Sequence, residues 1–586
     1  MGQVSENIPR ESASARPPFR RAVDSLWPVV AAGLLCAVLI TVVLTASLRE
    51  NQGRLVYALD DAYIHMAMAK NLAGHGVFGV TPYEFTFATS SPLWTLLLAG
   101  IYKVAGVSSA VPLVLNILSA LLGLAVLAIL FARHAASARG RFLALVLVLY
   151  LTPLVPLVFA GMEHTLQVAA SLALLMLGAI SLADARSPAS SPAEPEPLRG
   201  NAVTPASRPG ASPTRRRGRT APPLLYVIAV LAVGIRYEAL FLVAAFVLLF
   251  LVRRRVWAAL GLALAGALPV VVAGAISVSH GDAWLPTSLL LKGVVPHFST
   301  PVSLVRGLGY TAIQRLTSQE PLLLVLALVC VITILWNAGR MGRWSERQIL
   351  LTAVLMTLFL HVQFARTGWF HRYEAYLVAM GAAAVLASLG DLSFAELRRR
   401  IRSDSVPRVA GTALLALLVV LPFHYRAKAA LSDTVPATGN IHGQQYQMGR
   451  FLRAHYQGAS VAANDIGAIN YLAELRCLDL WGLGTREVAR AKRSDSYTTA
   501  TIATLARERG TRIAIVYAGW FTEPALPAAW IPAGRWTIPH NIVCGGETIE
   551  FLATDESELP HLVEALQAFA DSLPPAVRQS GPYLGE

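Results

Sequence analysis

The chain has 586 residues, of which 55% are apolar and only 14% are charged, and this composition excludes a large soluble enzyme. Its formal net charge of +14 comes from short arginine clusters between apolar segments, so we expect no nucleic-acid partner. Four cysteines without metal-ligand spacing are too few for a disulfide scaffold, and an integral membrane protein is the expected class.

The first apolar run, at 28–48, predicts a membrane anchor. It follows a polar tail and has no small-residue cleavage site before Arg49, which argues against a cleaved signal peptide. The run is close to the roughly 20 apolar residues that span the hydrocarbon core of a bilayer. We therefore expect residues 1–27 to form a cytoplasmic tail.

Basic clusters between the apolar runs orient the chain, because cytoplasmic loops carry an excess of lysine and arginine. If Asp60 lies outside and the cluster at 133–141 lies in the cytoplasm, an odd number of membrane crossings must separate them. Two apolar runs lie between them, so one of these runs does not cross the membrane. The run Pro92–Ala105 is below spanning length and contains Lys103, so we expect it to lie at the outer interface. Eleven crossing helices remain, near 28–48, 110–132, 142–160, 165–183, 223–235, 239–252, 256–279, 321–338, 349–364, 374–391 and 409–425.

This topology divides the chain into the cytoplasmic tail, a transmembrane domain at 28–425 and an extracytoplasmic domain at 426–586. The first outside loop covers 49–109. The segment 184–222 is rich in Pro, Ala, Ser and Arg, and we expect it to be a disordered cytoplasmic linker. The predicted fold class is a polytopic α-helical protein of the cell's inner (plasma) membrane with a C-terminal α/β domain.

The C-terminal domain alternates short β-rich runs with helical patterns, which is typical of a small α/β fold. The β-rich runs are 460–463, 512–516 and 548–553, and the helical patterns are 441–455, 498–509 and 559–571. Because disulfides persist outside the cytoplasm, we expect Cys477 and Cys544 of this domain to pair.

The strongest candidate for chemistry is the pair Asp60-Asp61 in the first outside loop, which lies between Tyr57 and Tyr63. Two adjacent carboxylates suit a general base or a divalent cation site. The alternative is that one of them caps a helix that begins near Ala62, although a cap needs only one carboxylate. A carboxylate pair beside apolar sequence favours a functional role.

His65 follows Asp61 by four residues, so the two side chains face the same way on a helix. The histidine is either a ligand at the acidic site or an ordinary hydrogen-bonded group.

Several short motifs occupy the predicted outside loops and the C-terminal domain in a fixed order. They are Asp60-Asp61-Ala62-Tyr63-Ile64, Ser90-Ser91-Pro92-Leu93-Trp94, Gly161-Met162-Glu163, Arg236-Tyr237-Glu238, Leu285-Pro286-Thr287-Ser288 with Lys292, Asn464-Asp465-Ile466-Gly467-Ala468, and Asp479-Leu480-Trp481-Gly482-Leu483. In this order they resemble the GT-C superfamily of polytopic glycosyltransferases. That superfamily includes protein O-mannosyltransferases, aminoarabinose transferases, arabinofuranosyltransferase-like proteins and oligosaccharyltransferases.

The resemblance implies transfer of a hexose or pentose from a polyprenyl phosphate to an acceptor hydroxyl on the extracytoplasmic face. The acceptor would be a glycan, lipid or protein of the cell envelope. Asp60 or Asp61 would be the base, and Asp60 is our choice because it lies nearer the helix end. Neighbouring cations such as Lys292 or Arg372 are expected to hold its pKa down. Whether a divalent cation binds at the pair stays open.

Lys292, Arg236 and Arg372 are the candidate partners of the donor phosphate, and the resemblance adds Glu238 to the same site. A positive residue beside a membrane span can instead anchor that span by snorkelling. Glu163 and His164 are candidates for orienting the acceptor or binding a cation. A structural ion pair between a glutamate and an arginine is the alternative for this loop.

Two other classes of protein share the general pattern. A secondary transporter predicts internal repeats with matched broken helices, which the sequence does not show, and an α/β domain of this size is unusual for one. A non-catalytic envelope-assembly protein gives no reason for the acidic first loop.

Overall fold

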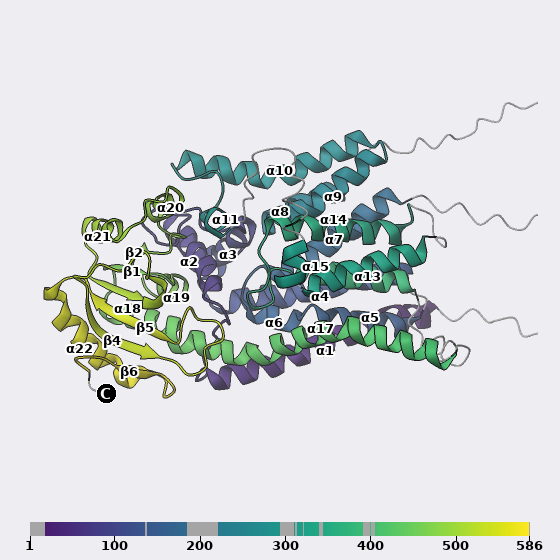
Figure 1. Cartoon of the computed structure of the whole chain (residues 1–586). Coiled ribbons are helices and arrows are strands. Elements are labelled where there is room, and N and C mark those ends of the chain that lie inside the picture. Colours follow the sequence, from purple (N-terminus) through teal and green to yellow (C-terminus); the bar gives the residue numbers. More distant parts are fainter. Residues whose placement is uncertain are drawn as a thin grey trace, which may run out of the picture.

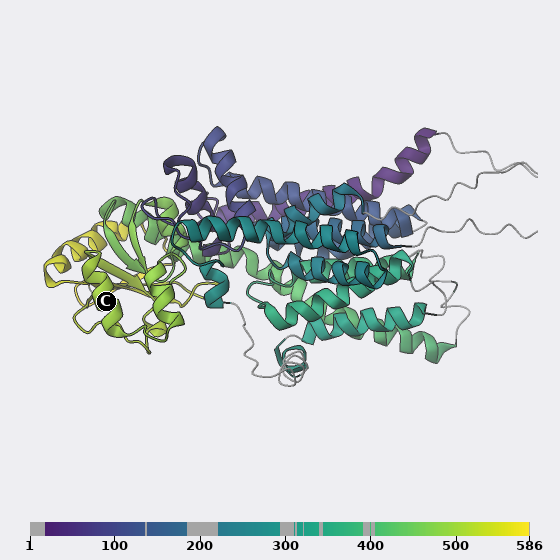
Figure 2. The same cartoon turned by 90° about the horizontal axis from the view of Figure 1, so that it is seen from above.

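The computed structural model describes residues 18–134, 137–183, 221–292, 310, 313–319, 321–338, 344–390, 399 and 405–584. A helical bundle and a sheet domain follow one another along the long axis of the molecule (Figures 1 and 2). Most of the predicted cytoplasmic tail and of the predicted linker 184–222 lies outside the described residues.

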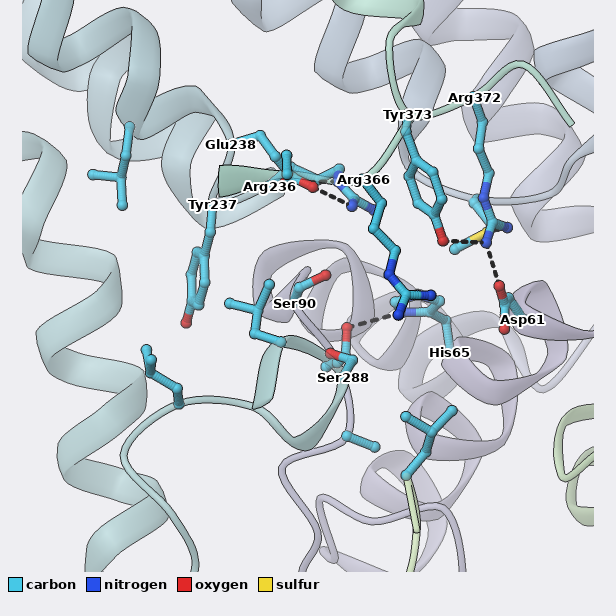
Figure 3. Close-up of a pocket in the computed structure, with 18 of the residues that line it drawn as sticks. Asp61, His65, Ser90, Arg236, Tyr237, Glu238, Ser288, Arg366, Arg372 and Tyr373 are labelled. Carbon is cyan, nitrogen blue, oxygen red and sulfur yellow. Dashed lines mark hydrogen bonds and ion pairs between the residues drawn. The ribbon is translucent and has the colours of Figure 1, made fainter. Parts of the chain in front are cut away.

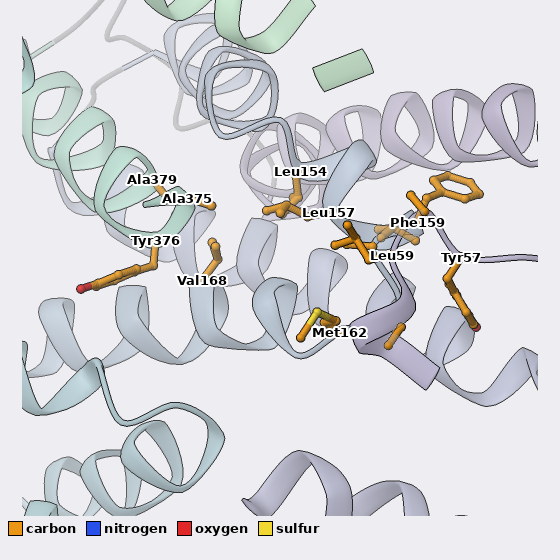
Figure 4. Packing of buried hydrophobic residues seen from close by; sticks show 14 of the residues in the cluster. Tyr57, Leu59, Leu154, Leu157, Phe159, Met162, Val168, Ala375, Tyr376 and Ala379 are labelled. Atoms are coloured by element: carbon orange, nitrogen blue, oxygen red, sulfur yellow. The ribbon is translucent and has the colours of Figure 1, made fainter. Parts of the chain in front are cut away.

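The bundle consists of helices that run roughly side by side (Figures 1 and 2). They are α1 (Pro18–Glu50), α4 (Ala110–His134), α5 (Ala138–Leu151), α6 (Leu154–Phe159), α7 (His164–Leu182), α8 (Pro223–Ile235), α9 (Ala239–Val252), α10 (Val256–Ser279), α13 (Pro321–Asn337), α14 (Glu346–Phe364), α15 (Ala375–Leu389) and α17 (Val406–Ile441). Their buried faces are apolar, as in the packing of α6, α7 and α15 around Leu157, Val168 and Tyr376 (Figure 4).

Within the described residues, five helices are long and apolar enough to cross a membrane. These are Leu26–Glu50, Ala110–His134, His164–Leu182, Val256–Ser279 and Glu346–Phe364. Five further apolar helices have 10–17 residues, among them Pro92–Ala105, which is the run expected at the interface. The chain is thus a multi-pass helical membrane protein. The predicted eleven crossings require that the other four shorter apolar helices cross too, and also the segment of α5 and α6 and helix α17.

The largest differences from the predicted helices are at α1, α5 and α17. Helix α1 begins at Pro18, before the expected start at 28 and within the predicted tail 1–27. The expected helix 142–160 is divided into α5 and α6 around Pro153, which has no backbone N–H to continue the helical ladder. Helix α17 continues to Ile441, well past the predicted end at 425, so the expected domain boundary falls inside a helix. Its extension packs on α1, where Thr438 Oγ1 lies 2.9 Å from Ser47 Oγ.

Three shorter helices lie between the bundle and the sheet domain (Figure 1). They are α2 (Asp60–His75), α3 (Pro92–Ala105) and α11 (Thr287–Lys292). Leu72 and Ala73 of α2 pack on an apolar cluster around Trp94 and Tyr102 of α3. The acidic pair thus begins a helix, and this helix lies at the junction of the two parts of the molecule.

The C-terminal domain is built on a six-stranded sheet with the order β2-β1-β3-β5-β4-β6. Strands β2, β1 and β3 are parallel, and the remaining pairs are antiparallel. The strands are β1 (Ser460–Ala463), β2 (Arg476–Asp479), β3 (Ile513–Val516), β4 (Ile531–Thr537), β5 (Thr548–Ala553) and β6 (Arg578–Ser580). The helices are α18 (Gln447–His455), α19 (Gly467–Leu472), α20 (Arg486–Arg493), α21 (Thr499–Glu508) and α22 (Leu559–Phe569).

The expected disulfide between Cys477 and Cys544 is wrong, because both cysteines are free and buried. Cys477 lies in β2 at one edge of the sheet, whereas Cys544 precedes β5, and strands β1 and β3 lie between them. The Cys544 thiol instead contacts Gln445 Oε1 at 3.3 Å.

Candidate active site

A cavity of about 290 Å³ lies where the bundle meets the C-terminal domain. Its lining comes from helices α2, α9, α10, α11 and the end of α14 (Figure 3). The loops before α3, between α6 and α7, between α8 and α9 and between α14 and α15 also line it. The polar residues among those that line it are Asp61, His65, Thr89, Ser90, Arg236, Tyr237, Glu238, Ser288, Arg366, Arg372 and Tyr373. One residue of the C-terminal domain, Leu483, also lines the cavity. Several sequence motifs far apart in the chain therefore meet at one site.

Asp61 and Arg372 form an ion pair at the cavity (Figure 3). Arg372 lies in the loop between α14 and α15, and its side chain is 1% exposed, whereas that of Asp61 is 25% exposed. The guanidinium also donates to the Tyr373 hydroxyl at 3.0 Å and contacts Met162 Sδ at 2.8 Å. Because the guanidinium is fixed by these contacts, it holds the Asp61 carboxylate in one orientation at the cavity wall.

Asp60 does not line the cavity, although it precedes Asp61 directly. Its two carboxylate oxygens accept hydrogen bonds from the backbone N–H groups of Gly467 at 2.7 Å and Ala468 at 2.8 Å. Burial and the neighbouring Asp465 carboxylate raise the pKa of Asp60 to about 8. The expectation that Arg372 lowers the pKa of Asp60 is therefore wrong, because Arg372 pairs with Asp61.

Arg236 is enclosed by two carboxylates. Its guanidinium donates to Glu163 Oε1 at 2.6 Å and to the two oxygens of Glu238 at 2.5 and 2.9 Å. These bonds connect the loop between α8 and α9 with the residue before α7. The charge of Arg236 is therefore already compensated, and Glu163 makes the structural ion pair that was the alternative for its loop.

The two candidate histidines lie beside this ion pair in buried positions. His65 Nδ1 is 3.0 Å from Thr95 Oγ1, and its Nε2 is 3.7 Å from Glu163 Oε2. His164 Nδ1 is 3.2 Å from Gln167 Oε1. Burial lowers the pKa of His65, so this residue is a neutral hydrogen-bonding group at neutral pH.

The acidic pair does not fit a shared divalent cation. Asp60 faces the backbone of the C-terminal domain, and Asp61 faces Arg372, so the two carboxylates do not converge. In the part of the chain that the structure describes, no group of three or more His, Cys, Asp or Glu side chains is arranged to hold a metal ion.

Arg366 lines the cavity although the sequence analysis did not name it, whereas Ser288 and Leu483 line it as members of motifs that were given no separate role. The exposed Arg366 extends its guanidinium into the cavity beside Ser288 (Figure 3), and no carboxylate among the described residues forms an ion pair with it. Its position in the predicted outside loop 365–373, shared with Arg372, was the available signal. The side chain of Lys292, the last residue of α11, lies outside the described part of the structure.

Comparisons with known proteins give one match to a family and two solved structures. Residues 439–555 match a family described as a domain of unknown function (DUF8728). The Archaeoglobus fulgidus oligosaccharyltransferase, solved in complex with Zn and sulfate, is 13% identical with a TM-score of 0.45, over 91% of this chain and 77% of that chain. ArnT from Cupriavidus metallidurans in the apo state is 14% identical with a TM-score of 0.47, over 90% of this chain and 99% of that chain. No curated protein sequence matches significantly.

Proposed function

We propose that the chain is a glycosyltransferase that moves a sugar from a polyprenyl phosphate to an acceptor hydroxyl on the extracytoplasmic face. The observation that carries this proposal is that one cavity is lined by an acidic group, Asp61, and by a basic group, Arg366, whose guanidinium extends into it (Figure 3). The order of the sequence motifs, which resembles that of the GT-C superfamily, supports the same reaction.

In this reaction the acceptor oxygen attacks the anomeric carbon of the donor sugar. Its proton passes to the Asp61 carboxylate, the bond between the anomeric carbon and the phosphate oxygen breaks, and the electron pair leaves with the polyprenyl phosphate. A single displacement of this kind inverts the anomeric carbon. We assign the base to Asp61 rather than Asp60, because Asp61 lines the cavity and Asp60 faces the C-terminal domain.

The leaving phosphate needs a cationic partner, since its charge develops as the bond breaks. Arg366 suits this role because it enters the cavity without an ion-pair partner among the described residues. Arg372 contributes through its charge while it holds Asp61, whereas Arg236 is compensated by Glu163 and Glu238. The apolar lining from α9 and α10, which includes Leu240, Phe241 and Val270, suits the first part of a polyprenyl chain.

Binding of the donor can be measured without knowledge of the acceptor. The purified chain is mixed with polyprenyl-phosphate hexoses and pentoses in turn, and the thermal midpoint is compared with that in polyprenyl phosphate alone. A true donor raises the thermal midpoint because it binds the folded state. At a concentration 100-fold above its Kd, it should raise the free energy of unfolding by about 2.7 kcal/mol. A flat response to every lipid-linked sugar would contradict the proposed donor class.

A protease test examines the proposed topology of eleven crossings with the N-terminus in the cytoplasm and the C-terminal domain outside. Protease added to right-side-out membrane vesicles should spare the segment 184–222, because its cluster Arg215–Arg219 resists translocation in a short loop. Cleavage within the C-terminal domain serves as the control for access. Cleavage at 184–222 from outside would overturn the proposed orientation.

The pH dependence of transfer distinguishes the two aspartates. A base with the pKa of Asp60 is protonated below about pH 8, so the rate would rise with pH up to that value. Because the base is assigned to Asp61, Asp60→Asn should leave the shape of the pH profile from about pH 5.5 to 9 unchanged, even where it lowers the rate. If the wild-type profile rises to about pH 8 and Asp60→Asn removes that rise, the base is Asp60.

A further inference from the structure

The C-terminal domain is held by α2 at both ends of α19. At the start of α2, the Asp60 carboxylate accepts hydrogen bonds from the N–H groups of Gly467 and Ala468. Near the end of α2, Lys70 Nζ donates to the carbonyl oxygens of Asn470 at 3.1 Å and Tyr471 at 2.8 Å. A helix leaves N–H groups unpaired at its start and carbonyl groups unpaired at its end. In α19 an acidic side chain pairs with the N–H groups, and a basic side chain pairs with the carbonyl groups.

The approach at the Asp60 end is so close that it requires a glycine. A Cβ atom added at Gly467 would lie 2.1 Å from the main-chain oxygen of Asp60 and 2.7 Å from its carboxylate Oδ2. Because the first of these neighbours is backbone, the clash could be relieved only by moving α2 and α19 apart. Gly467 is therefore part of the attachment.

The attachment continues to the cavity through the parallel sheet. Strand β1, which leads into α19, pairs in register with β2, with Ala463 opposite Asp479. The Asp479 carboxylate accepts hydrogen bonds from the backbone N–H groups of Trp481 and Gly484, each at 2.7 Å. These bonds fix the conformation of the loop that follows β2. We call residues 480–485 the wall loop, because it carries Leu483 into the cavity lining.

The wall loop is also bonded to the opposite side of the cavity. The carbonyl oxygen of Leu483 accepts a hydrogen bond from Thr287 Oγ1 at 2.7 Å, and Thr287 begins α11. Beyond the loop, Arg486 donates to the carbonyl of His280 at 3.0 Å, at the end of α10. The position of the C-terminal domain therefore decides whether this part of the cavity is closed.

We propose that Asp60 and Lys70 are positioning residues that fasten the C-terminal domain to α2, so that the wall loop closes the cavity and Asp61 keeps its orientation. Asp60 and Asp61 lie in the same helical turn, with one bonded to the C-terminal domain and the other to Arg372. The functional part of this inference rests on the proposed function, whereas the fastening itself does not. In this proposal Asp60 attaches the C-terminal domain, and Asp61 takes part in the chemistry.

The experiment uses the full-length purified protein and measures backbone hydrogen exchange alongside sugar transfer. Lys70→Met removes the basic end of the attachment, and Asp60→Ala removes the acidic end. Each should raise exchange in 467–472 and in the wall loop by about tenfold or more, because local opening becomes easier. The kcat of sugar transfer should fall by roughly tenfold. The KM for the donor should change little, because Arg366, the proposed partner of the donor phosphate, is unchanged.

Lys103→Met is the matched control, since Lys103 Nζ also donates to a backbone carbonyl, that of Ala73 at 3.1 Å, but does not contact the C-terminal domain. It should leave exchange and transfer at wild-type values, and Lys70→Arg should restore both toward them. If backbone hydrogen exchange in the wall loop stayed at the wild-type rate in both Lys70→Met and Asp60→Ala, the inference would be wrong. A different result would separate the two proposals. If the variants showed raised hydrogen exchange but the wild-type protein transferred no sugar, the attachment would be supported and the proposed function would be wrong.

Discussion

Replacing Asp61 by asparagine is expected to lower sugar transfer by roughly two to four orders of magnitude, which is the usual contribution of a general base. The amide has almost the same shape as the carboxylate, and its oxygen can still accept a hydrogen bond from Arg372. It cannot take the proton of the acceptor hydroxyl. The loss should therefore appear in kcat of the purified protein at saturating donor and acceptor.

Asp571→Asn is the control for this change, because Asp571 is an exposed carboxylate of the C-terminal domain that does not line the cavity. It should retain wild-type transfer. The loss of the Asp61 charge leaves the buried Arg372 without a negatively charged partner, so the thermal midpoint of Asp61→Asn must be measured too. Near-normal turnover in a folded Asp61→Asn protein would remove Asp61 from the reaction.

The second large effect is expected at Arg366. Replacing it by glutamine should lower kcat by roughly 100- to 1,000-fold, because the departing phosphate loses a positive charge held at the cavity. Arg366→Lys should recover part of the rate, since it restores the charge without the planar fork of the guanidinium. The measurement is release of polyprenyl phosphate over time with each variant.

Arg493→Gln is the matched control for Arg366→Gln, because Arg493 is an exposed arginine at the end of α20 that does not line the cavity. It should leave phosphate release unchanged. If Arg366→Gln releases polyprenyl phosphate at the wild-type rate, another cation must receive the phosphate.

The hydrophobic pattern predicts the helices of the bundle closely because each crossing is a self-contained apolar run. Helices α8 and α9 have the ranges expected from the sequence, and so does α3. The pattern misses the end of α17, because Arg426 and the polar residues after it are typical of a loop outside the membrane. There the helix continues because Thr438 and its neighbours pack on α1 rather than on lipid.

The acidic pair shows where a local sequence pattern stops being informative. Consecutive residues on a helix point about 100° apart, so Asp60 and Asp61 face different neighbours. Which of them enters the cavity depends on the rotation of α2 about its axis. That rotation is fixed by contacts with Gly467 and Arg372, which are more than 300 residues away in the chain. Nearness to the helix end therefore does not predict which of the two carboxylates lines the cavity.

The cationic residues were harder to rank for a similar reason. Arg236, Arg372 and Arg366 all lie in loops predicted to be outside, and each could serve a phosphate by position alone. Their difference lies in the carboxylates around them, because Glu163 is brought to Arg236 by the packing of α7 against α8. An arginine can be assigned to substrate or to structure only when its partners are known.

The most direct test of the glycosyltransferase assignment is to place the purified chain in vesicles with a polyprenyl-phosphate sugar that carries label in both the sugar and the lipid. A donor chosen by the thermal-midpoint measurement is used, with extracted envelope material as acceptor. The proposed function predicts that labelled polyprenyl phosphate is released in equal amount to the sugar that becomes bound to acceptor, and that Asp61→Asn abolishes both together. Movement of intact donor or free sugar across the membrane without release of polyprenyl phosphate would contradict it.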